Sequence, residues 1–280
     1  MDGKTCVVTG ANAGIGKETA VGLAAAGADV VMVCRDAGRG GAARDEVAAR
    51  AGSERVTLKL ADLASLADVR RLAGELAAEH PTLDVLLNNA AIMPRTRETS
   101  RDGHELQFAV NHLAPFLLTT ALLDPLKESA PARVVTVASN AHRKGVIDFD
   151  DLDAERRYDS RLAYCTSKLM NVLFTRELSR RLEGTGVTAN CLHPGVISTT
   201  LLRQYFPPLG PFKFLTNLFF MTPEDGAKTS IWAATAPELA DVSGAYLNDS
   251  KVGEAEQRGR DDAVAARLWD VSEELCGRVS

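Results

Sequence analysis

The sequence lacks features that would assign it to several other classes of protein. No apolar stretch reaches 18 residues, so none can cross a bilayer as a helix. Lys and Arg (32) do not outnumber Asp and Glu (37), and the net charge of −5 argues against a nucleic-acid surface. The N-terminal MDGKTCVVTG has no basic region followed by an apolar one, which predicts no secretory signal peptide.

Cysteine is also scarce, and its spacing carries no metal motif. Five residues are scattered along the chain without a CxxC pair: Cys6, Cys34, Cys165, Cys191 and Cys276. We therefore expect reduced thiols in a cytoplasmic protein and no bound metal.

The composition that remains is that of a globular protein, with 45% apolar and 25% charged residues. Short apolar runs alternate with Ala-, Leu-, Glu- and Arg-rich stretches of helical spacing, such as Ile15–Ala26 and Leu66–Glu79. Unbroken apolar runs are typical of parallel strands covered on both faces. We predict one domain over residues 1–280, a doubly wound Rossmann-type α/β fold with helices on both faces of a parallel sheet. The expected strands are Thr5–Thr9, Asp29–Cys34, Arg55–Leu60, Leu83–Asn88, Arg133–Ala138, Gly186–Leu192 and Gly244–Leu247, and a closing helix begins near Asp261.

A glycine-rich turn follows the first predicted strand. Its residues are Thr9, Gly10, Ala11, Asn12, Ala13, Gly14, Ile15 and Gly16. Glycines at this spacing permit a tight turn, close approach of backbone N–H groups to a pyrophosphate, and packing of helix on strand. The motif favours dinucleotide binding over a plain turn because it lies at the first strand-to-helix junction.

The end of the second strand bears on the choice of cofactor. Cys34 takes the last strand position and Arg35 follows, so a guanidinium can pair the 2′-phosphate of NADP(H). NADP(H) is favoured over NAD(H). A small shift in register would instead bring Asp36 to the ribose, and a solvated Arg-Asp turn is the third interpretation.

Two further strand ends carry candidate cofactor contacts. Asp62 and Leu63 follow the third strand, where the carboxylate can accept from the adenine amino group or cap the next helix. Asn89 and Ala90 follow the fourth strand, where small residues leave room for the adenosine ribose. An ordinary turn is the alternative there.

Tyr164 and Lys168 share one face of a predicted helix at i and i+4. We expect the lysine cation to lower the pKa of the phenol, which can then exchange a proton with a carbonyl/alcohol pair. Ser139 lies at the carboxyl end of the fifth strand, where ligands of open α/β sheets bind, and can donate to the substrate oxygen. Exposed helix residues and a capping hydroxyl are the alternatives.

Asn111 lies in the predicted helix that precedes the fifth strand. Pro115, four residues later, has no N–H to donate to the Asn111 carbonyl. That carbonyl is then free to hold a water that relays protons from Lys168. A kinked helix without chemistry is the alternative.

These motifs, in this order, resemble the short-chain dehydrogenase/reductase superfamily over nearly the whole chain. Within it, RDAGRG, NHLAPFLLT, SNAH and YCTSKLMNVLF resemble the branch of retinol dehydrogenases and WW-domain oxidoreductases. The resemblance implies a catalytic tetrad of Asn111, Ser139, Tyr164 and Lys168, with Tyr164 as acid/base and Lys168 also on the nicotinamide ribose.

The resemblance also implies that residues after the sixth strand hold the carboxamide of the cofactor: Pro194, Gly195, Val196, Ile197 and Thr199. The chain departs from the family at Ala91, where glycine is usual and an added methyl can crowd the cofactor. We also expect no N-terminal membrane anchor of the kind that the vertebrate retinol enzymes have, which weakens the case for a retinoid substrate.

Leu201–Met221 holds three of the eleven prolines and five of the nine phenylalanines. We expect a substrate lid at about 199–222 whose aromatic residues line a pocket for a bulky apolar molecule. An interface in a homo-oligomer or contact with a membrane surface are the alternatives. The charged stretch from His142 is interpreted as a solvated loop, with His142 and His193 structural.

The sequence thus predicts an NADP(H)-dependent oxidoreductase that interconverts a carbonyl and an alcohol on a bulky apolar small molecule, a ketoreductase with a place in specialised metabolism. One alternative is an epimerase or cyclase on the same fold, with the cofactor retained as a structural part. A nucleotide-sensing protein without turnover is less favoured, because Tyr164 and Lys168 are both present.

Overall fold

The computed structural model describes residues 1–195 and 221–277. Among these residues, eight strands form one sheet in the order β3-β2-β1-β4-β5-β6-β7-β8. Strands β1 to β7 pair in parallel, and β8 pairs antiparallel to β7. The strands are β1 Thr5–Thr9, β2 Asp29–Cys34, β3 Val56–Leu60, β4 Val85–Asn88, β5 Ala132–Val137, β6 Val187–His193, β7 Tyr246–Asn248 and β8 Lys251–Gly253.

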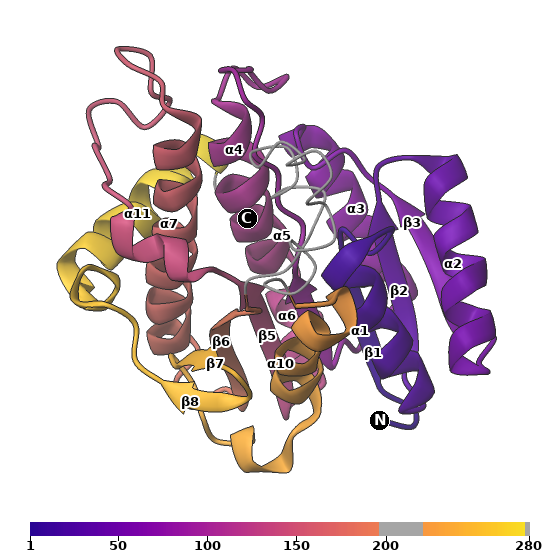
Figure 1. The fold of residues 1–280 in the computed structure, drawn as a ribbon. Coiled ribbons are helices and arrows are strands. Elements are labelled where there is room, and N and C mark those ends of the chain that lie inside the picture. Colours follow the sequence, from indigo (N-terminus) through magenta and orange to yellow (C-terminus); the bar gives the residue numbers. More distant parts are fainter. Residues whose placement is uncertain (196–220, 278–280) are drawn as a thin grey trace.

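Helices lie between consecutive strands from β1 to β7 and form a layer on each face of the sheet (Figure 1). The α-helices are α1 Gly14–Ala25, α2 Ala37–Ala51, α3 Leu66–Glu79, α4 Leu106–Phe108, α5 Ala114–Ala121, α6 Leu123–Glu128, α7 Ser160–Arg181, α10 Pro223–Thr235 and α11 Asp262–Cys276. A π-helix, η1, spans Ala109–Leu113, and 3₁₀-helices span Asn140–Lys144 (η2), Pro237–Leu239 (η4) and Gln257–Arg260 (η5). The doubly wound fold is confirmed, and the predicted strands lie within two residues of these bounds.

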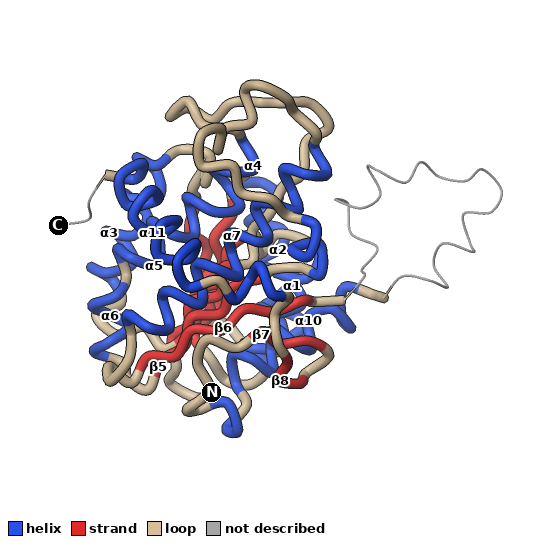
Figure 2. Tube along the Cα trace, turned by 90° about the vertical axis from the view of Figure 1, so that its left-hand side faces the viewer, coloured by secondary structure: helices blue, strands red, loops and turns tan. Residues whose placement is uncertain are grey.

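Two cores lie on opposite faces because successive side chains of each strand point to opposite sides. Val7 of β1 belongs to the core that includes side chains of α3, α5, α7 and α11. Its neighbours Cys6 and Val8 belong to the core beneath α1, α2 and α10. Figure 2 shows the strands in the middle of the molecule between these two groups of helices.

Strand β8 was not predicted. Asp249 and Ser250 join it to β7, and both have positive φ angles, of 52° and 51°. Two consecutive residues in this region form the kind of tight turn whose twist suits a two-residue hairpin. The final pair of strands is therefore a hairpin at the edge of the parallel sheet.

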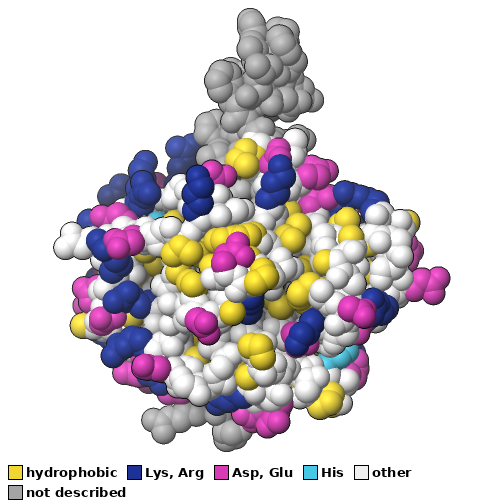
Figure 3. Space-filling view, turned by 90° about the horizontal axis from the view of Figure 1, so that it is seen from below, with side chains coloured by type: hydrophobic (Ala, Val, Ile, Leu, Met, Phe, Trp, Pro, Cys, Tyr) yellow, Lys and Arg dark blue, Asp and Glu magenta, His cyan; other side chains and the backbone are white. Residues whose placement is uncertain are grey.

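The surface seen from below carries Lys and Arg side chains interspersed with Asp and Glu, and hydrophobic side chains lie among them (Figure 3).

In the described part of the chain, no helix combines the length and apolar character needed to cross a membrane. The same residues contain no group of three His, Cys, Asp or Glu side chains placed to hold a metal ion. All five cysteines are free thiols.

Candidate active site

The glycine-rich turn between β1 and α1 packs directly on the end of β4. A Cβ added to Gly10 would meet Ala90 Cα at 2.8 Å, and one added to Gly16 would meet Asn89 Nδ2 at 2.4 Å. A Cβ on Gly14, in contrast, would meet no atom of the described residues within 4 Å, and this residue has a φ of 57°. Two glycines thus allow close packing, and the third lies at the open side of the turn with a backbone conformation that favours glycine.

The side chains of Thr9 and Asn89 hold this turn in place. Thr9 Oγ1 accepts hydrogen bonds from the N–H groups of Asn89 and Ala90, at 3.0 and 3.1 Å. Asn89 Nδ2 donates to the carbonyl oxygens of Thr9 and Gly10, at 2.8 and 3.3 Å. The side-chain amide of Asn89 therefore holds the glycine-rich turn in shape, a role that the sequence did not suggest.

Among the described residues, no side chain caps the N-terminus of α1. Its N-cap, Ala13, provides no side-chain hydrogen bond, and the first turn contains no acidic residue. By contrast, side chains cap α2, α3, α7, α10 and α11. Free N–H groups and the positive end of the helix dipole suit a phosphate. The turn and helix therefore fit the pyrophosphate of a dinucleotide, with Asn12, Ile15 and Gly14 on the same turn.

The residues after β2 have the predicted register. Cys34 ends the strand, and the exposed Arg35 follows it. Asp36 is the N-cap of α2: its carboxylate accepts from Arg39 N at 2.8 Å and pairs with the Arg39 guanidinium at 3.5 Å. The Arg39 backbone N–H and side chain lower the pKa of Asp36. The carboxylate is thus engaged with its own helix, and Arg35 provides the adjacent positive charge.

Asp62 does not cap the next helix. Ser65 is the N-cap of α3, and its Oγ accepts from Asp68 N at 3.4 Å. Asp62 Oδ1 accepts from Ala64 N at 3.1 Å, in the partly exposed turn after β3. Leu63 packs against the core on the α3 side of the sheet. The capping interpretation of Asp62 is therefore wrong, and its role toward adenine stays a prediction.

Ser139 and Tyr164 come together at the carboxyl end of β5. Ser139 follows the strand and caps η2, where its Oγ accepts from Ala141 N at 3.2 Å. Tyr164, one turn into α7, forms a side-chain hydrogen bond with Ser139. Burial raises the pKa of the Tyr164 phenol to about 12, which is opposite to the lowering we expected. Desolvation of the phenolate outweighs the hydrogen bond from Ser139.

Lys168 lies one turn further along α7, with its side chain 1% exposed. Its Nζ donates to Val137 O at 2.7 Å and lies 5.6 Å from the centroid of the Tyr164 ring. Burial lowers the pKa of Lys168 to about 7, so it is only partly protonated at neutral pH.

Asn111 lies in π-helix η1, which directly precedes α5, and Pro115 of α5 is four residues further on. The side chain of Asn111 is fully buried, accepts from Ile92 N at 2.8 Å, and donates to Ile92 O at 3.0 Å. It also donates to Ser167 Oγ at 3.0 Å. Asn111 therefore ties the segment after β4 to α7 beside Lys168, and the helix widens where Pro115 lacks an N–H.

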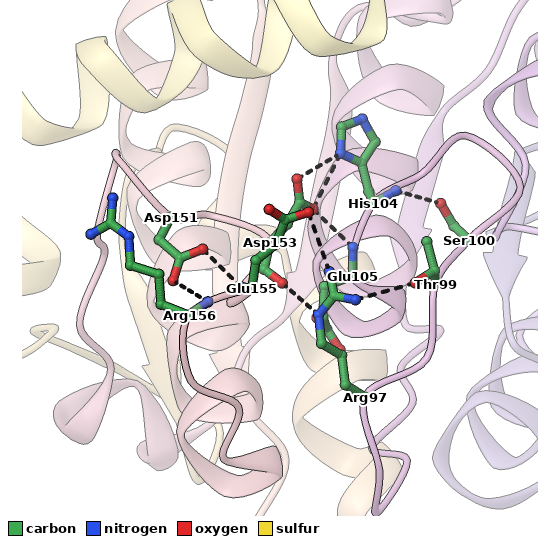
Figure 4. Close-up of polar contacts among 9 residues, drawn as sticks. All are labelled: Arg97, Thr99, Ser100, His104, Glu105, Asp151, Asp153, Glu155 and Arg156. Carbon is green, nitrogen blue, oxygen red and sulfur yellow. Dashed lines mark hydrogen bonds and ion pairs between the residues drawn. The ribbon is translucent and has the colours of Figure 1, made fainter.

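A polar network joins the segment before α7 to the segment before α4 (Figure 4). Asp153 accepts from Glu105 N at 2.8 Å and contacts His104 Nδ1 at 3.3 Å. Arg97 donates to the Asp153 carbonyl at 3.0 Å. The stretch expected to be a solvated loop is thus partly packed, because Asp153 has partners in the segment before α4.

Three more hydrogen bonds continue this contact toward the start of α7. Gln107 Nε2 donates to Tyr158 Oη at 2.9 Å and to Ser160 O at 3.1 Å. Ser160 Oγ donates to Pro94 O. Because α7 begins at Ser160, the network fixes the end of the helix that carries Tyr164.

The last group of predicted residues follows β6. Pro194 and Gly195 are partly exposed, and a Cβ on Gly195 would meet Met221 Sδ at 2.4 Å. Ile197 and Thr199 lie outside the described residues, as does the expected lid except for Met221 and Thr222. The structure therefore brings together the glycine-rich turn, Arg35, Ser139, Tyr164, Lys168 and Asn111 along the carboxyl ends of the strands.

Comparison with known proteins identifies similar sequences and structures. The family model described as short chain dehydrogenase matches residues 4–209. Human retinol dehydrogenase 14 is 46% identical over 99% of this chain and 87% of its own length, and human retinol dehydrogenase 13 is 45% identical over 99% and 86%.

Solved structures show the same fold. An uncharacterized protein from Mycobacterium Paratuberculosis has a TM-score of 0.81 and 34% identity, covering 99% of this chain and 94% of that one. The Pseudomonas aeruginosa RhlG/NADP active-site complex has a TM-score of 0.72 and 26% identity, covering 89% and 95%.

Proposed function

Because this chain belongs to the short-chain dehydrogenase family and is an oxidoreductase, we propose that it transfers hydride between NADP(H) and a bulky apolar alcohol or carbonyl compound. Tyr164 is the acid/base in this proposal. The observation that carries it is the contact between Tyr164 and Ser139 at the carboxyl end of β5, with Lys168 buried behind them.

Three features of the described residues support binding of the dinucleotide. The uncapped N-terminus of α1 and the space at Gly14 suit its pyrophosphate, and Arg35 suits a 2′-phosphate. The contacts of Asp36 with Arg39 support NADP(H) over NAD(H). The Asp36 carboxylate is already bonded to Arg39, so it is less available to accept a hydrogen bond from the ribose 2′-hydroxyl of NAD(H). When bound, the cofactor supplies or accepts the hydride.

Residues of this chain then donate the proton and replace it from solvent. A phenol with a pKa of about 12 is protonated at neutral pH, so Tyr164 donates to the oxygen of a carbonyl as it is reduced. Ser139 donates a second hydrogen bond to the same oxygen and orients it. We propose that Lys168 and the Asn111 carbonyl complete the path by which the proton is replaced from solvent.

The substrate class is supported by the relatives, whose names give retinol, a bulky apolar alcohol. Oligomer formation, a cytoplasmic location and a role in specialised metabolism remain predictions, as does a single domain with a lid at about 199–222. An epimerase or cyclase would use the same Tyr164 with no net change in the cofactor.

The test is a panel of aldehydes and ketones, including retinaldehyde, with NADPH and with NADH. We expect NADPH to be consumed in step with alcohol formation, and the absorbance of NADPH to fall. A product formed while the NADPH concentration stays constant would favour the epimerase or cyclase. Tight NADPH binding with no product from any substrate would favour the sensor.

A further inference from the structure

His142 lies beneath the turn that carries Ser139. It is 1% exposed and belongs to η2, the short helix that Ser139 caps. The sequence suggested only a structural histidine in a solvated loop. Its two ring nitrogens have different partners, and one of these partners is the main chain of Ser139.

The hydrogen bonds of His142 determine which ring nitrogen carries the proton. Nε2 lies 3.2 Å from the main-chain N of Glu256, an N–H that can only donate. Nε2 must therefore accept, which places the ring proton on Nδ1. Nδ1 lies 2.7 Å from Ser139 O, a carbonyl that can only accept, so both bonds are satisfied by one neutral tautomer.

These bonds fix the backbone of Ser139. Its carbonyl accepts from His142 Nδ1 and also from His142 N at 3.0 Å, so both lone pairs are used. Its Oγ accepts from Ala141 N, which leaves the hydroxyl proton available for donation. A shift of the Ser139 carbonyl would therefore also move the hydroxyl that touches Tyr164.

The C-terminal segment supports the same turn from the other side. The Tyr246 ring of β7 lies 4.8 Å from the His142 ring, and Tyr246 Oη donates to Asn140 Oδ1 at 3.1 Å. Arg258 donates to Gly145 O at 3.2 Å. The contact with Glu256 is thus one of four that join this segment to η2 and to Gly145, which follows it.

We propose that His142 is a positioning residue for catalysis: its Nδ1–H holds the Ser139 carbonyl, and through it the Ser139 hydroxyl, in place for the substrate oxygen. This inference rests on the proposed function only for its effect on turnover. Burial, chiefly, and the nearby Arg143 lower the pKa of His142, whereas the Ser139 carbonyl and Glu256 raise it, and the net shift is downward. The neutral ring that the hydrogen bonds require is therefore the form present at neutral pH.

Two substitutions of His142 by amide residues test its hydrogen bond to Ser139 O and its hydrogen bond to Glu256 N separately. In His142→Asn, the amide nitrogen lies near the position of Nδ1 and can still donate to Ser139 O. In His142→Gln, the longer side chain places its amide near Nε2, where it can accept from Glu256 N–H but cannot reach Ser139 O. Both variants lose the ring and its packing on Tyr246, so they are matched for that loss.

The first readout is hydrogen exchange of the Ala141 and His142 amides, both of which donate to Ser139. We expect faster exchange in His142→Gln and near wild-type exchange in His142→Asn. This readout does not require turnover. It therefore decides the inference even if the wild type reduces none of the carbonyl compounds, a result that would overturn the proposed function alone.

The second readout is turnover with NADPH. Loss of one hydrogen bond that positions Ser139 should lower kcat by about tenfold in His142→Gln, with the KM for NADPH unchanged. His142→Asn should recover most of the loss. Equal losses in both variants, in exchange or in kcat, would show a packing role only, and no loss in either would also overturn the inference.

Discussion

Lys168 Nζ donates to the main-chain carbonyl of Val137, the last residue of β5, over 2.7 Å. Val137 lies two residues before Ser139, and Lys168 lies one turn after Tyr164. This buried hydrogen bond therefore joins α7 to the end of β5, close to the point where the phenol and the serine hydroxyl meet. Lys168 contributes to the geometry of the site as well as to its charge.

Replacement of Tyr164 by phenylalanine removes one hydroxyl and keeps the ring. We expect turnover to fall by about 10²–10⁴-fold, because the acid/base is lost. NADPH affinity, measured by titration, should remain close to that of the wild type. Near-normal turnover in Tyr164→Phe would show that another group transfers the proton.

The pH dependence of the two reaction directions should differ. The pKa of Tyr164 is raised to about 12, so the proton donor for carbonyl reduction is present throughout the neutral range. Alcohol oxidation requires the deprotonated site, and its rate should rise between about pH 7 and pH 10. Initial rates in both directions check this, and the rise should be absent in Tyr164→Phe. An oxidation rate that falls with pH would contradict the assignment.

Stability should also depend on pH through Lys168. Its folded-state pKa is about 7, below the ordinary value of 10.5, so the unfolded chain binds more protons between these values. Relative to a variant without the amine, the wild type should therefore gain free energy of unfolding as pH rises across this window, by roughly 1 kcal/mol per pH unit. Lys168→Met should lack this rise, which denaturant melts at several pH values would measure. Parallel curves for the two proteins would refute it.

The preference for NADP(H) depends on Arg35 in our proposal. Arg35→Ala should weaken NADPH binding by about 10- to 100-fold and leave NADH binding nearly unchanged, because only the 2′-phosphate contact is lost. Arg55→Ala is the matched control, since Arg55 precedes β3 and pairs with Asp2 and Asp29. Tighter binding of NADH than NADPH by the wild type would point to Asp36 as the residue that contacts the ribose.

The contact between His104 and Asp153 should stabilise the protein most at acidic pH. Asp153, chiefly, and also Asp102 raise the pKa of His104 above 6.5. The stabilisation from the protonated ring is therefore complete below pH 6.5 and is lost as pH rises through the folded-state pKa. The loss of stability in His104→Asn should be larger at pH 5.5 than at pH 8.5, as thermal melts can show. The opposite order would exclude an ionic contact.

The parallel core was predictable because buried strands are unbroken apolar runs. Leu66–Glu79 and Asp29–Cys34 were predicted with the bounds that the structure gives, since turn residues flank both. Strand β8 was missed because it is three exposed residues without an apolar pattern. Only its pairing with β7 makes it a strand.

The candidate site was predictable where the spacing of residues carries the chemistry. Tyr164 and Lys168 are four residues apart on one helix, and Ser139 is at a strand end. The partner of His142 at Glu256 is 114 residues away, and no local pattern reveals such a contact. The pKa of Tyr164 likewise depends on burial by distant segments, which is why its direction was predicted wrongly.

The short hairpin at the end of the sheet also affects how this protein behaves in concentrated solution. A parallel sheet that ended at β7 would offer an edge with unpaired backbone groups to another chain. Strand β8 covers that edge with only three residues, one of which is Lys251, and leaves little length for a further strand to pair with. The hairpin thus disfavours aggregation in which a strand of another chain pairs with the edge of the sheet.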